Sequence, residues 1–112
     1  MDKTVKKHLN DILMAIDEVE SYFEGGQKLY VNFSTDLKLR RAVERDIEII
    51  GEATNRILKT DKEISITNAR KIVDARNWII HGYDSLSVDI LWSIVVNHLP
   101  RLREEVVDLL AQ

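Results

Sequence analysis

The sequence predicts an all-α fold, a bundle of four or five helices that run alternately up and down. Apolar residues recur at steps of three and four along most of the 112 residues, which is the spacing of one buried helix face. No stretch keeps the alternation of apolar and polar residues that marks a half-buried strand. Hydrophobic residues make up 45% of the chain and charged residues 31%, a balance typical of a compact globular domain. We therefore expect a single helical domain over residues 1–112.

The first helix is expected to end at Gly25-Gly26, because glycine favours helix ends. Residues 27–33 are expected to form a short connector with apolar side chains. The apolar stripe of this helix consists of Val5, Leu9, Ile12, Ile16, Val19 and Phe23.

A second helix is expected to begin at Ser34 or Thr35, since either hydroxyl can cap it. Gly51 lies inside this helix, where glycine costs about 1 kcal/mol relative to alanine. Close approach of another backbone is one physical reason to keep a glycine there. The buried stripe consists of Leu39, Val43, Ile47, Ile50 and Ile57.

A polar loop over residues 60–66 precedes the third helix, which Thr67 is expected to cap and Gly82 to end. Ser87 is expected to cap the fourth. Pro100 lies inside the periodic pattern of the fourth helix, so this last helix should be kinked there, or a fifth should begin. The apolar residues of these segments are Ala69, Ile72, Val73, Ile79, Ile80, Leu91, Ile94, Val95, Leu99, Leu102, Val106, Leu109 and Leu110.

Several classes of protein are disfavoured by composition. The chain has no run of about 18 apolar residues, so no membrane span is expected, and its N-terminus lacks the apolar stretch of a signal peptide. It contains no cysteine, which leaves no disulfide framework or thiolate metal site.

His8, His81 and His98 lie far apart, so we expect no metal site and no cofactor. His98 falls on the apolar side of its helix and is expected to be a core or interface histidine whose hydrogen bonds are satisfied. We expect a cytoplasmic protein.

The charges are unevenly spread although the formal net charge is −3. Residues 28–76 carry eleven Lys or Arg against eight Asp or Glu, and both flanking parts are acidic. Arg40, Arg41 and Arg45 lie in this basic part and are candidates for contact with RNA phosphates. The alternative interpretation is that these arginines form a solvated helix face.

Arg76 and His81 are the candidate catalytic residues. Histidine is easily poised as an acid or base near neutral pH, and the planar fork of arginine matches phosphate oxygens. Such a pair can cleave an RNA phosphodiester without a metal, because the adjacent 2′-hydroxyl supplies the nucleophile. The histidine would take or deliver a proton, and the arginine would stabilise the phosphorane. For this pair alone, the alternative is a histidine placed at a helix C-terminus by the helix dipole.

The spacing of the two residues sets a geometric condition. Positions five apart on a regular helix diverge by roughly 140°, so Arg76 and His81 do not share one face. The imidazole would have to swing away where Gly82 ends the helix, or two copies of the chain would have to meet across a two-fold axis. Asn77 and His81 do face the same way, so Asn77 is expected to orient the imidazole or bind a phosphate.

Three other residues have two interpretations each. Glu52 follows Gly51 and is a candidate partner for Arg76, because a buried arginine needs a carboxylate or a ligand; the alternative is an ordinary exposed helix glutamate. Trp78 and Trp92 could stack on bases, but burial in the bundle or in a dimer interface is the favoured expectation.

The pattern R-N-x-x-x-H-x-Y is formed by Arg76, Asn77, His81 and Tyr83. It resembles the signature of the HEPN superfamily, and of its HepT-like ribonuclease toxins in particular.

Two more segments resemble the same family. ERDIEIIGEATNRI, residues 44–57, is similar to its second-helix motif, and ILWSIVVNHLPRLREEV, residues 90–106, is similar to its last helix, including the leucine–proline step. The resemblance thus covers nearly the whole chain.

The resemblance implies an all-α homodimer with its active cleft at the subunit interface, and a metal-independent ribonuclease in which Arg76 and His81 are catalytic. It also implies a cognate MntA-type nucleotidyltransferase antitoxin that transfers AMP from ATP to the tyrosine of the H-x-Y element, here Tyr83. A bulky anionic group beside Arg76 and His81 would occupy the positive charge that an RNA phosphate needs.

A second function remains open at this point. The chain could be a non-catalytic HEPN binding module that docks a minimal nucleotidyltransferase and presents a tyrosine to it. Both functions need Tyr83 to be exposed and the dimer to be stable, so the motif alone does not choose between them.

Overall fold

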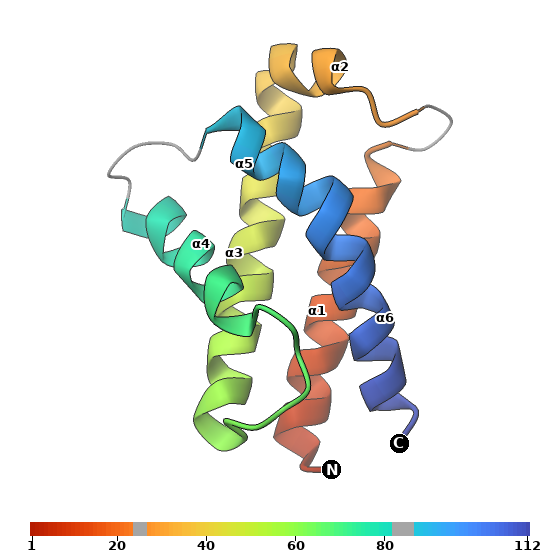
Figure 1. Ribbon diagram of the computed structural model, residues 1–112, viewed down its shortest axis with the longest axis vertical. Helices are drawn as coiled ribbons and strands as arrows, with labels where there is room; N and C mark the ends of the chain where they lie inside the picture. Colours follow the sequence, from red (N-terminus) through yellow and green to blue (C-terminus); the bar gives the residue numbers. More distant parts are fainter. Residues whose placement is uncertain (24–26, 82–86) are drawn as a thin grey trace.

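Two long helices, α1 (Lys3–Ser21) and α3 (Leu37–Thr60), run antiparallel through the centre of the fold. The structure is a computed structural model that describes all residues except 24–26 and 82–86. α4 (Ala69–His81) packs mainly on α3, and the last helix returns beside α1, so that both termini lie at one end (Figure 1). The described residues form helices, turns and loops but no strand. The predicted all-α bundle is confirmed.

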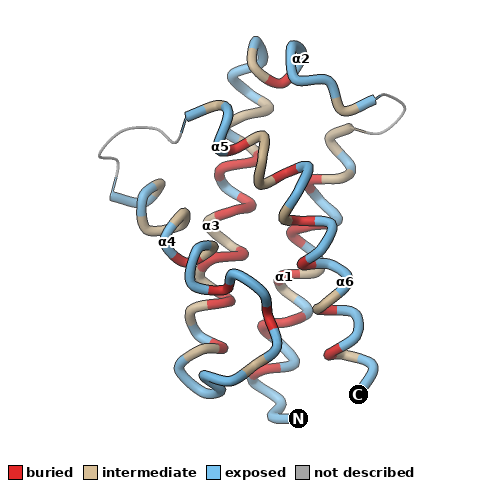
Figure 2. The backbone as a smooth tube through the Cα atoms, viewed as in Figure 1, coloured by how far each residue is buried: buried red, intermediate tan, exposed pale blue. Residues whose placement is uncertain are grey.

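The core lies between α1, α3 and the last helix. Figure 2 shows buried residues recurring on the sides of these helices that face one another. Most of the predicted apolar stripes are buried, and each large side chain adds about 1.5–3 kcal/mol to the stability of the fold. The largest fully buried side chains are Phe33, Leu9, Ile12, Ile16, Ile47, Ile50, Ile57, Leu91 and Leu99. No helix in the described part of the chain is long and apolar enough to cross a bilayer.

The predicted connector over residues 27–33 is partly wrong, because a short helix, α2 (Tyr30–Thr35), begins inside it. Phe33 anchors α2: its ring is fully buried, and the ring centroid lies 5.1 Å from that of Trp92. The Tyr30 hydroxyl also donates to Asp89 at 2.6 Å. These contacts with residues far along the sequence stabilise a helix that is too short to be stable alone.

The predicted caps of α3 are also wrong. The hydroxyls of Ser34 and Thr35 donate to the carbonyl of Val31 inside α2. Asp36 caps α3 instead, because its Oδ1 accepts a hydrogen bond from the Leu39 N–H at 3.0 Å.

The loop before α4 is held by the last helix. Thr67 does not cap α4; its hydroxyl and its backbone N–H both donate to the Glu105 carboxylate. α4 begins two residues later, after Asn68, whose φ of 59° lies in the left-handed region. Asparagine is one of the few residues that tolerates this conformation.

The last helix consists of three consecutive segments: α5 (Val88–Ser93), the π turn η1 (Ile94–His98) and α6 (Leu99–Leu110). Ser87 caps it as predicted, and its Oγ accepts from the Ile90 N–H at 3.1 Å.

The predicted irregularity at Pro100 takes the form of the π turn. Pro100 has no N–H to donate to the carbonyl of Val96, and its ring would collide with that carbonyl in a regular helix. The turn before it is wider than an α turn, since the Leu99 N–H bonds the carbonyl of Ile94. The wider turn accommodates the proline without ending the helix.

A buried carboxylate lies between α1 and α3. Asp46 is only 1% exposed, and its Oδ2 accepts a hydrogen bond from the Tyr22 hydroxyl at 2.7 Å. Its Oδ1 has no donor among the described residues. Burial raises the pKa of Asp46 to about 6, and the nearby Glu18 carboxylate adds to the rise. The charged form of Asp46 therefore costs stability at neutral pH.

We expect Asp46→Asn to raise the free energy of unfolding at pH 8 by up to about 3 kcal/mol, since the pKa of Asp46 rises from 3.8 to about 6 and one pKa unit corresponds to about 1.4 kcal/mol. The folded pKa exceeds the unfolded one. The folded state therefore binds more protons between about pH 4 and pH 6, and the wild type loses stability as pH rises through that window. Urea unfolding should show the two proteins diverging there. Asp74→Asn, an exposed change on α4, should show no such divergence. A constant difference between Asp46→Asn and wild type would contradict the assignment.

Candidate active site

Gly51 is where α3 and α4 come closest. A Cβ built on Gly51 would lie 2.2 Å from the Cβ of Arg76, 2.8 Å from its Cγ, and 3.2 Å from the carbonyl oxygen of Ile72. A side chain therefore does not fit there. The close approach that the sequence suggested for this glycine is confirmed, and it places the stem of Arg76 directly on the α3 backbone.

The Arg76 guanidinium is held by two neighbours. Its Nη2 lies 2.5 Å from Glu52 Oε2, and its Nη1 donates to Asn77 Oδ1 at 2.8 Å. The side chain is 24% exposed. Its Nε is buried and has no acceptor among the described residues. The group is thus fixed in orientation while part of it remains accessible.

Glu52 binds a second arginine. Its Oε1 lies 2.8 Å from the Nε of Arg56, one helical turn further along α3. The hydrogen bond from Arg56 lowers the pKa of Glu52, and the positive charge of Arg76 lowers it further. Glu52 is therefore ionised at neutral pH and lies between two guanidinium groups. Arg56 was not among the site residues expected from the sequence, although its spacing of four residues from Glu52 is the signal that indicates such a pair.

His81 is the last residue of α4 and is exposed. Because α4 is helical through His81, the divergence expected for residues five apart holds. Arg76 contacts Gly51 and Glu52 on α3, and on a helix that continues through His81 the position of His81 lies roughly 140° away around the axis. Asn77 uses its side-chain oxygen to hold Arg76. One copy of the chain therefore does not bring the two candidate catalytic groups to one face of α4.

The surface beside His81 is apolar. Trp78 is 45% exposed and Ile80 is 49% exposed, so the favoured burial of Trp78 within the bundle is wrong and the dimer-interface expectation stays a prediction. The predicted helix end at Gly82 and the predicted modification site Tyr83 both lie outside the described residues.

The three candidate RNA-binding arginines each have a partner nearby. Arg40 donates to the carbonyl of Ser34 at 2.6 Å. Arg41 pairs with Glu44, and the Nη1 of Arg45 lies 3.1 Å from Glu48 Oε2. Each of the three side chains is therefore held by an acceptor close to it in the sequence.

Arg45 alone of the three reaches the neighbourhood of Glu52. It lines an open groove of 370 Å³ together with Glu52 and Arg56. The other residues of this groove are Lys7, His8, Asp11, Ile49 and Ala53. Among the side chains that the structure describes, no three His, Asp or Glu residues are grouped closely enough to hold a metal ion.

Comparisons with known proteins agree on one protein family. A family model described as Ribonuclease HepT-like matches residues 12–109. "Probable ribonuclease HepT" from Thermococcus cleftensis is 32% identical over 104 residues, which cover 92% of this chain and 93% of that protein. A Methanocaldococcus jannaschii protein named "Putative RNase" is 33% identical over 106 residues, which cover 93% of this chain and 94% of that protein.

One further relative is longer than this chain. The M. jannaschii protein named "Gamma-glutamylcyclotransferase and putative RNase" is 30% identical over 113 aligned residues, and the chain spans half of its length. No solved structure matches the chain. The family model covers most of the sequence, and two relatives match along nearly their whole length. The chain therefore belongs to the HepT-like ribonuclease family.

Proposed function

We propose that the chain is a metal-independent endoribonuclease toxin that acts as a homodimer through Arg76 and His81. The observation that carries this proposal is the fixed guanidinium: Glu52 and Asn77 orient Arg76 on the same helix that ends in the exposed His81. A guanidinium whose orientation is set before the substrate arrives is the kind of group that stabilises developing charge.

The geometry of α4 supports the proposed homodimer. Arg76 and His81 diverge around the helix, so a cleft between two copies is the simple way to bring both groups to one phosphate. The exposed Trp78 and Ile80 next to His81 supply apolar area that a second copy would cover. In this arrangement each protomer contributes to the cleft, and a monomer is inactive.

The proposed reaction is transesterification. The 2′-hydroxyl of the substrate loses its proton and attacks the adjacent phosphorus, while the bond to the 5′-oxygen breaks. His81 takes the first proton or protonates the leaving oxygen. Arg76 donates hydrogen bonds to the phosphorane oxygens as their charge increases. The products are a 2′,3′-cyclic phosphate and a 5′-hydroxyl.

The groove lined by Arg45 and Arg56 is the proposed path of the RNA backbone toward Arg76. Glu52 lines this groove and binds both Arg56 and Arg76. Of the three arginines selected from the sequence, Arg45 is the one retained as an RNA contact, because it lines this groove and Arg40 and Arg41 do not.

The proposed partner is an MntA-type nucleotidyltransferase antitoxin that AMPylates Tyr83. Tyr83 follows His81 by two residues, so an attached AMP would lie close to the imidazole. Its phosphate would compete with RNA for the positive charge of Arg76.

Expression without the antitoxin tests the toxin function against the docking function. We expect growth arrest and RNA cleavage from the wild type, and neither from His81→Ala. A purified wild type that leaves cellular RNA intact while it binds the nucleotidyltransferase would instead support the non-catalytic docking module.

Cleavage is expected to persist in excess EDTA, because the proposed chemistry needs no metal. End-group analysis should find a cyclic phosphate on the 5′ fragment. Activity that disappears with EDTA and returns with magnesium, or a plain 3′-hydroxyl product, would contradict the 2′-hydroxyl route.

Tyr83→Phe is expected to keep nuclease activity within about twofold of wild type, because the phenol takes no part in the proposed proton transfers. The variant should escape inhibition by the nucleotidyltransferase and ATP. Incubation of each protein with both, followed by mass spectrometry and an RNA cleavage assay, measures modification and inhibition together. Full inhibition of Tyr83→Phe through another modified residue would refute this switch.

A further inference from the structure

A cavity of 180 Å³ lies between α3, α4 and the last helix, and neither Arg76 nor its partners Glu52 and Asn77 line it. Its walls are mostly aliphatic. α3 contributes Ile47 and Ile50, α4 contributes Ile72 and Ala75, and the last helix contributes Ile90, Ile94 and Leu99. Because α4 packs mainly on α3, the space between α4 and the π turn stays open. Its apolar surface is available to a ligand.

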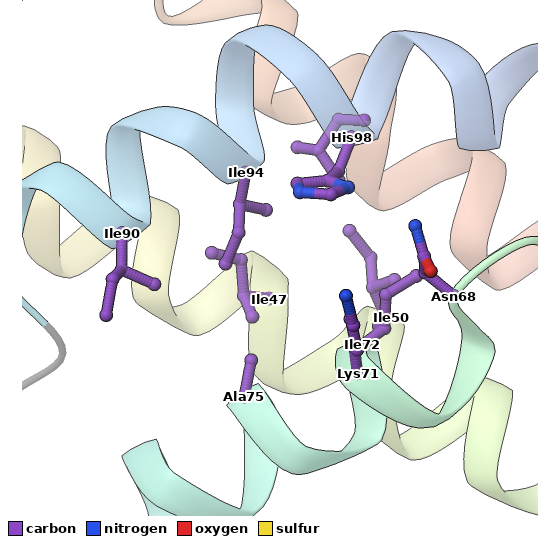
Figure 3. A pocket seen from close by; sticks show the side chains of 10 residues that line it. Ile47, Ile50, Asn68, Lys71, Ile72, Ala75, Ile90, Ile94 and His98 are labelled. Carbon is purple, nitrogen blue, oxygen red and sulfur yellow. The ribbon is translucent and has the colours of Figure 1, made fainter.

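Three nitrogen-bearing side chains gather at one end of this cavity. Figure 3 shows the Lys71 ammonium, the Asn68 amide and the His98 imidazole on the same side, away from Ile90. None of the three side chains makes a hydrogen bond or ion pair with another residue in the described parts of the chain. The cavity thus combines an aliphatic wall with a cluster of unused donors.

Two uncommon backbone conformations place these groups. Asn68 has a φ of 59° where the chain enters α4, and His98 is the last residue of the π turn. Left-handed non-glycine residues and π turns are both rare and recur at functional sites. Here both irregular segments contribute a side chain to the same end of the same cavity.

We propose that this cavity binds a small organic anion with a hydrocarbon body, such as a medium-chain carboxylate. The hydrocarbon lies against the isoleucines. The carboxylate accepts hydrogen bonds from Lys71 and from the amide or ring N–H groups of Asn68 and His98. Among the described residues, no Asp or Glu lines the cavity, so the charge of this part of the site favours an anion over a cation. The site is independent of the nuclease function.

Three ligands that differ mainly in the head group test the charge preference: octanoate, 1-octanol and octylammonium, each below its aggregation concentration. Backbone amide NMR titration is expected to show octanoate shifting residues around Lys71 and His98. Octanoate should bind about tenfold more tightly than octanol, as one charged hydrogen-bonded contact predicts, and octylammonium most weakly. Equal binding of octanoate and octanol, or shifts spread over the whole surface, would overturn the proposal.

Two variants separate the head-group contact from the apolar wall. Lys71→Met should remove the difference between octanoate and octanol, whereas the matched control Lys62→Met, in an exposed loop, should preserve it. Ala75→Leu fills the cavity and should weaken the binding of both octanoate and octanol. Thermal unfolding confirms that each variant is folded. An unchanged preference for octanoate in Lys71→Met would contradict the site.

Two other occupants of the cavity would be revealed by separate measurements. If a second copy of the chain covers it, sedimentation will show a dimer that Ile90→Asp dissociates, and the wild type will not bind octanoate. If a membrane surface is the source of the anion, the protein will co-sediment with phosphatidylglycerol vesicles and Lys71→Met will stay in solution. Either result would overturn the proposal, which expects octanoate binding and no vesicle binding.

Discussion

Changing Arg76 to lysine is expected to lower the rate of RNA cleavage about a hundredfold or more while the protein stays folded. Lysine keeps the Cβ and Cγ that pack on Gly51, so the contact between α3 and α4 survives. It loses the planar fork that bonds Glu52 and Asn77 at the same time. A single ammonium on a flexible stem does not hold two neighbours and a phosphate in one plane.

A matched control is available on the same helix. Arg70 is exposed on α4, and Arg70→Lys should leave cleavage unchanged. Glu52→Gln keeps the shape of the carboxylate but removes its charge, so it should loosen Arg76. The expected loss is about tenfold and falls mainly on kcat, since the orientation of Arg76 matters most in the transition state. Single-turnover cleavage of a labelled RNA measures all three variants. If Arg76→Lys cleaves RNA at the wild-type rate, Arg76 is not a catalytic residue.

The helices of this chain were predictable because their stability depends on a buried apolar face, and the spacing of apolar residues in the sequence indicates that face. Their ends were less predictable. Ser34 and Thr35 are good caps in isolation, yet the neighbouring turn of α2 takes their hydroxyls. Thr67 likewise binds Glu105, which lies on a different helix. A hydroxyl binds the nearest acceptor in the folded chain, and the sequence does not state which acceptor that is.

The site was predictable in its parts and less so in its arrangement. The ion pair of Glu52 with Arg76 was suggested because a half-buried arginine needs a carboxylate, and the pair is present. Arg56 was overlooked, although it competes for the same carboxylate. His98 was expected in the core or an interface with its hydrogen bonds satisfied; it lines a cavity without a hydrogen-bond partner among the described residues, and the interface expectation stays a prediction. Apolar periodicity shows which face of a helix turns inward, and it does not show where two inward faces fail to meet.

Replacing Gly51 with alanine is expected to destabilise the fold by roughly 1–3 kcal/mol, the usual cost of inserting an atom into a well-packed contact. Helix propensity alone predicts that the substitution stabilises the fold, because alanine is favoured over glycine by about 1 kcal/mol inside a helix. The new Cβ would lie 2.2 Å from the Cβ of Arg76. That atom is fixed to the α4 backbone and does not rotate away, so α4 itself has to move.

Chemical unfolding of Gly51→Ala measures the stability, and RNA cleavage measures the displacement of Arg76; a shift of about 1 Å can lower the rate about a hundredfold. Asn55→Ala, on the same helix, is the control for helix propensity and should be neutral or slightly stabilising. Arg76→Gly removes the two clashing atoms, so the double variant should be more stable than the sum of its single changes predicts. Strict additivity, or a Gly51→Ala protein more stable than wild type, would show that α4 moves aside at little cost. The contact at Gly51 would then not be what holds Arg76 in place.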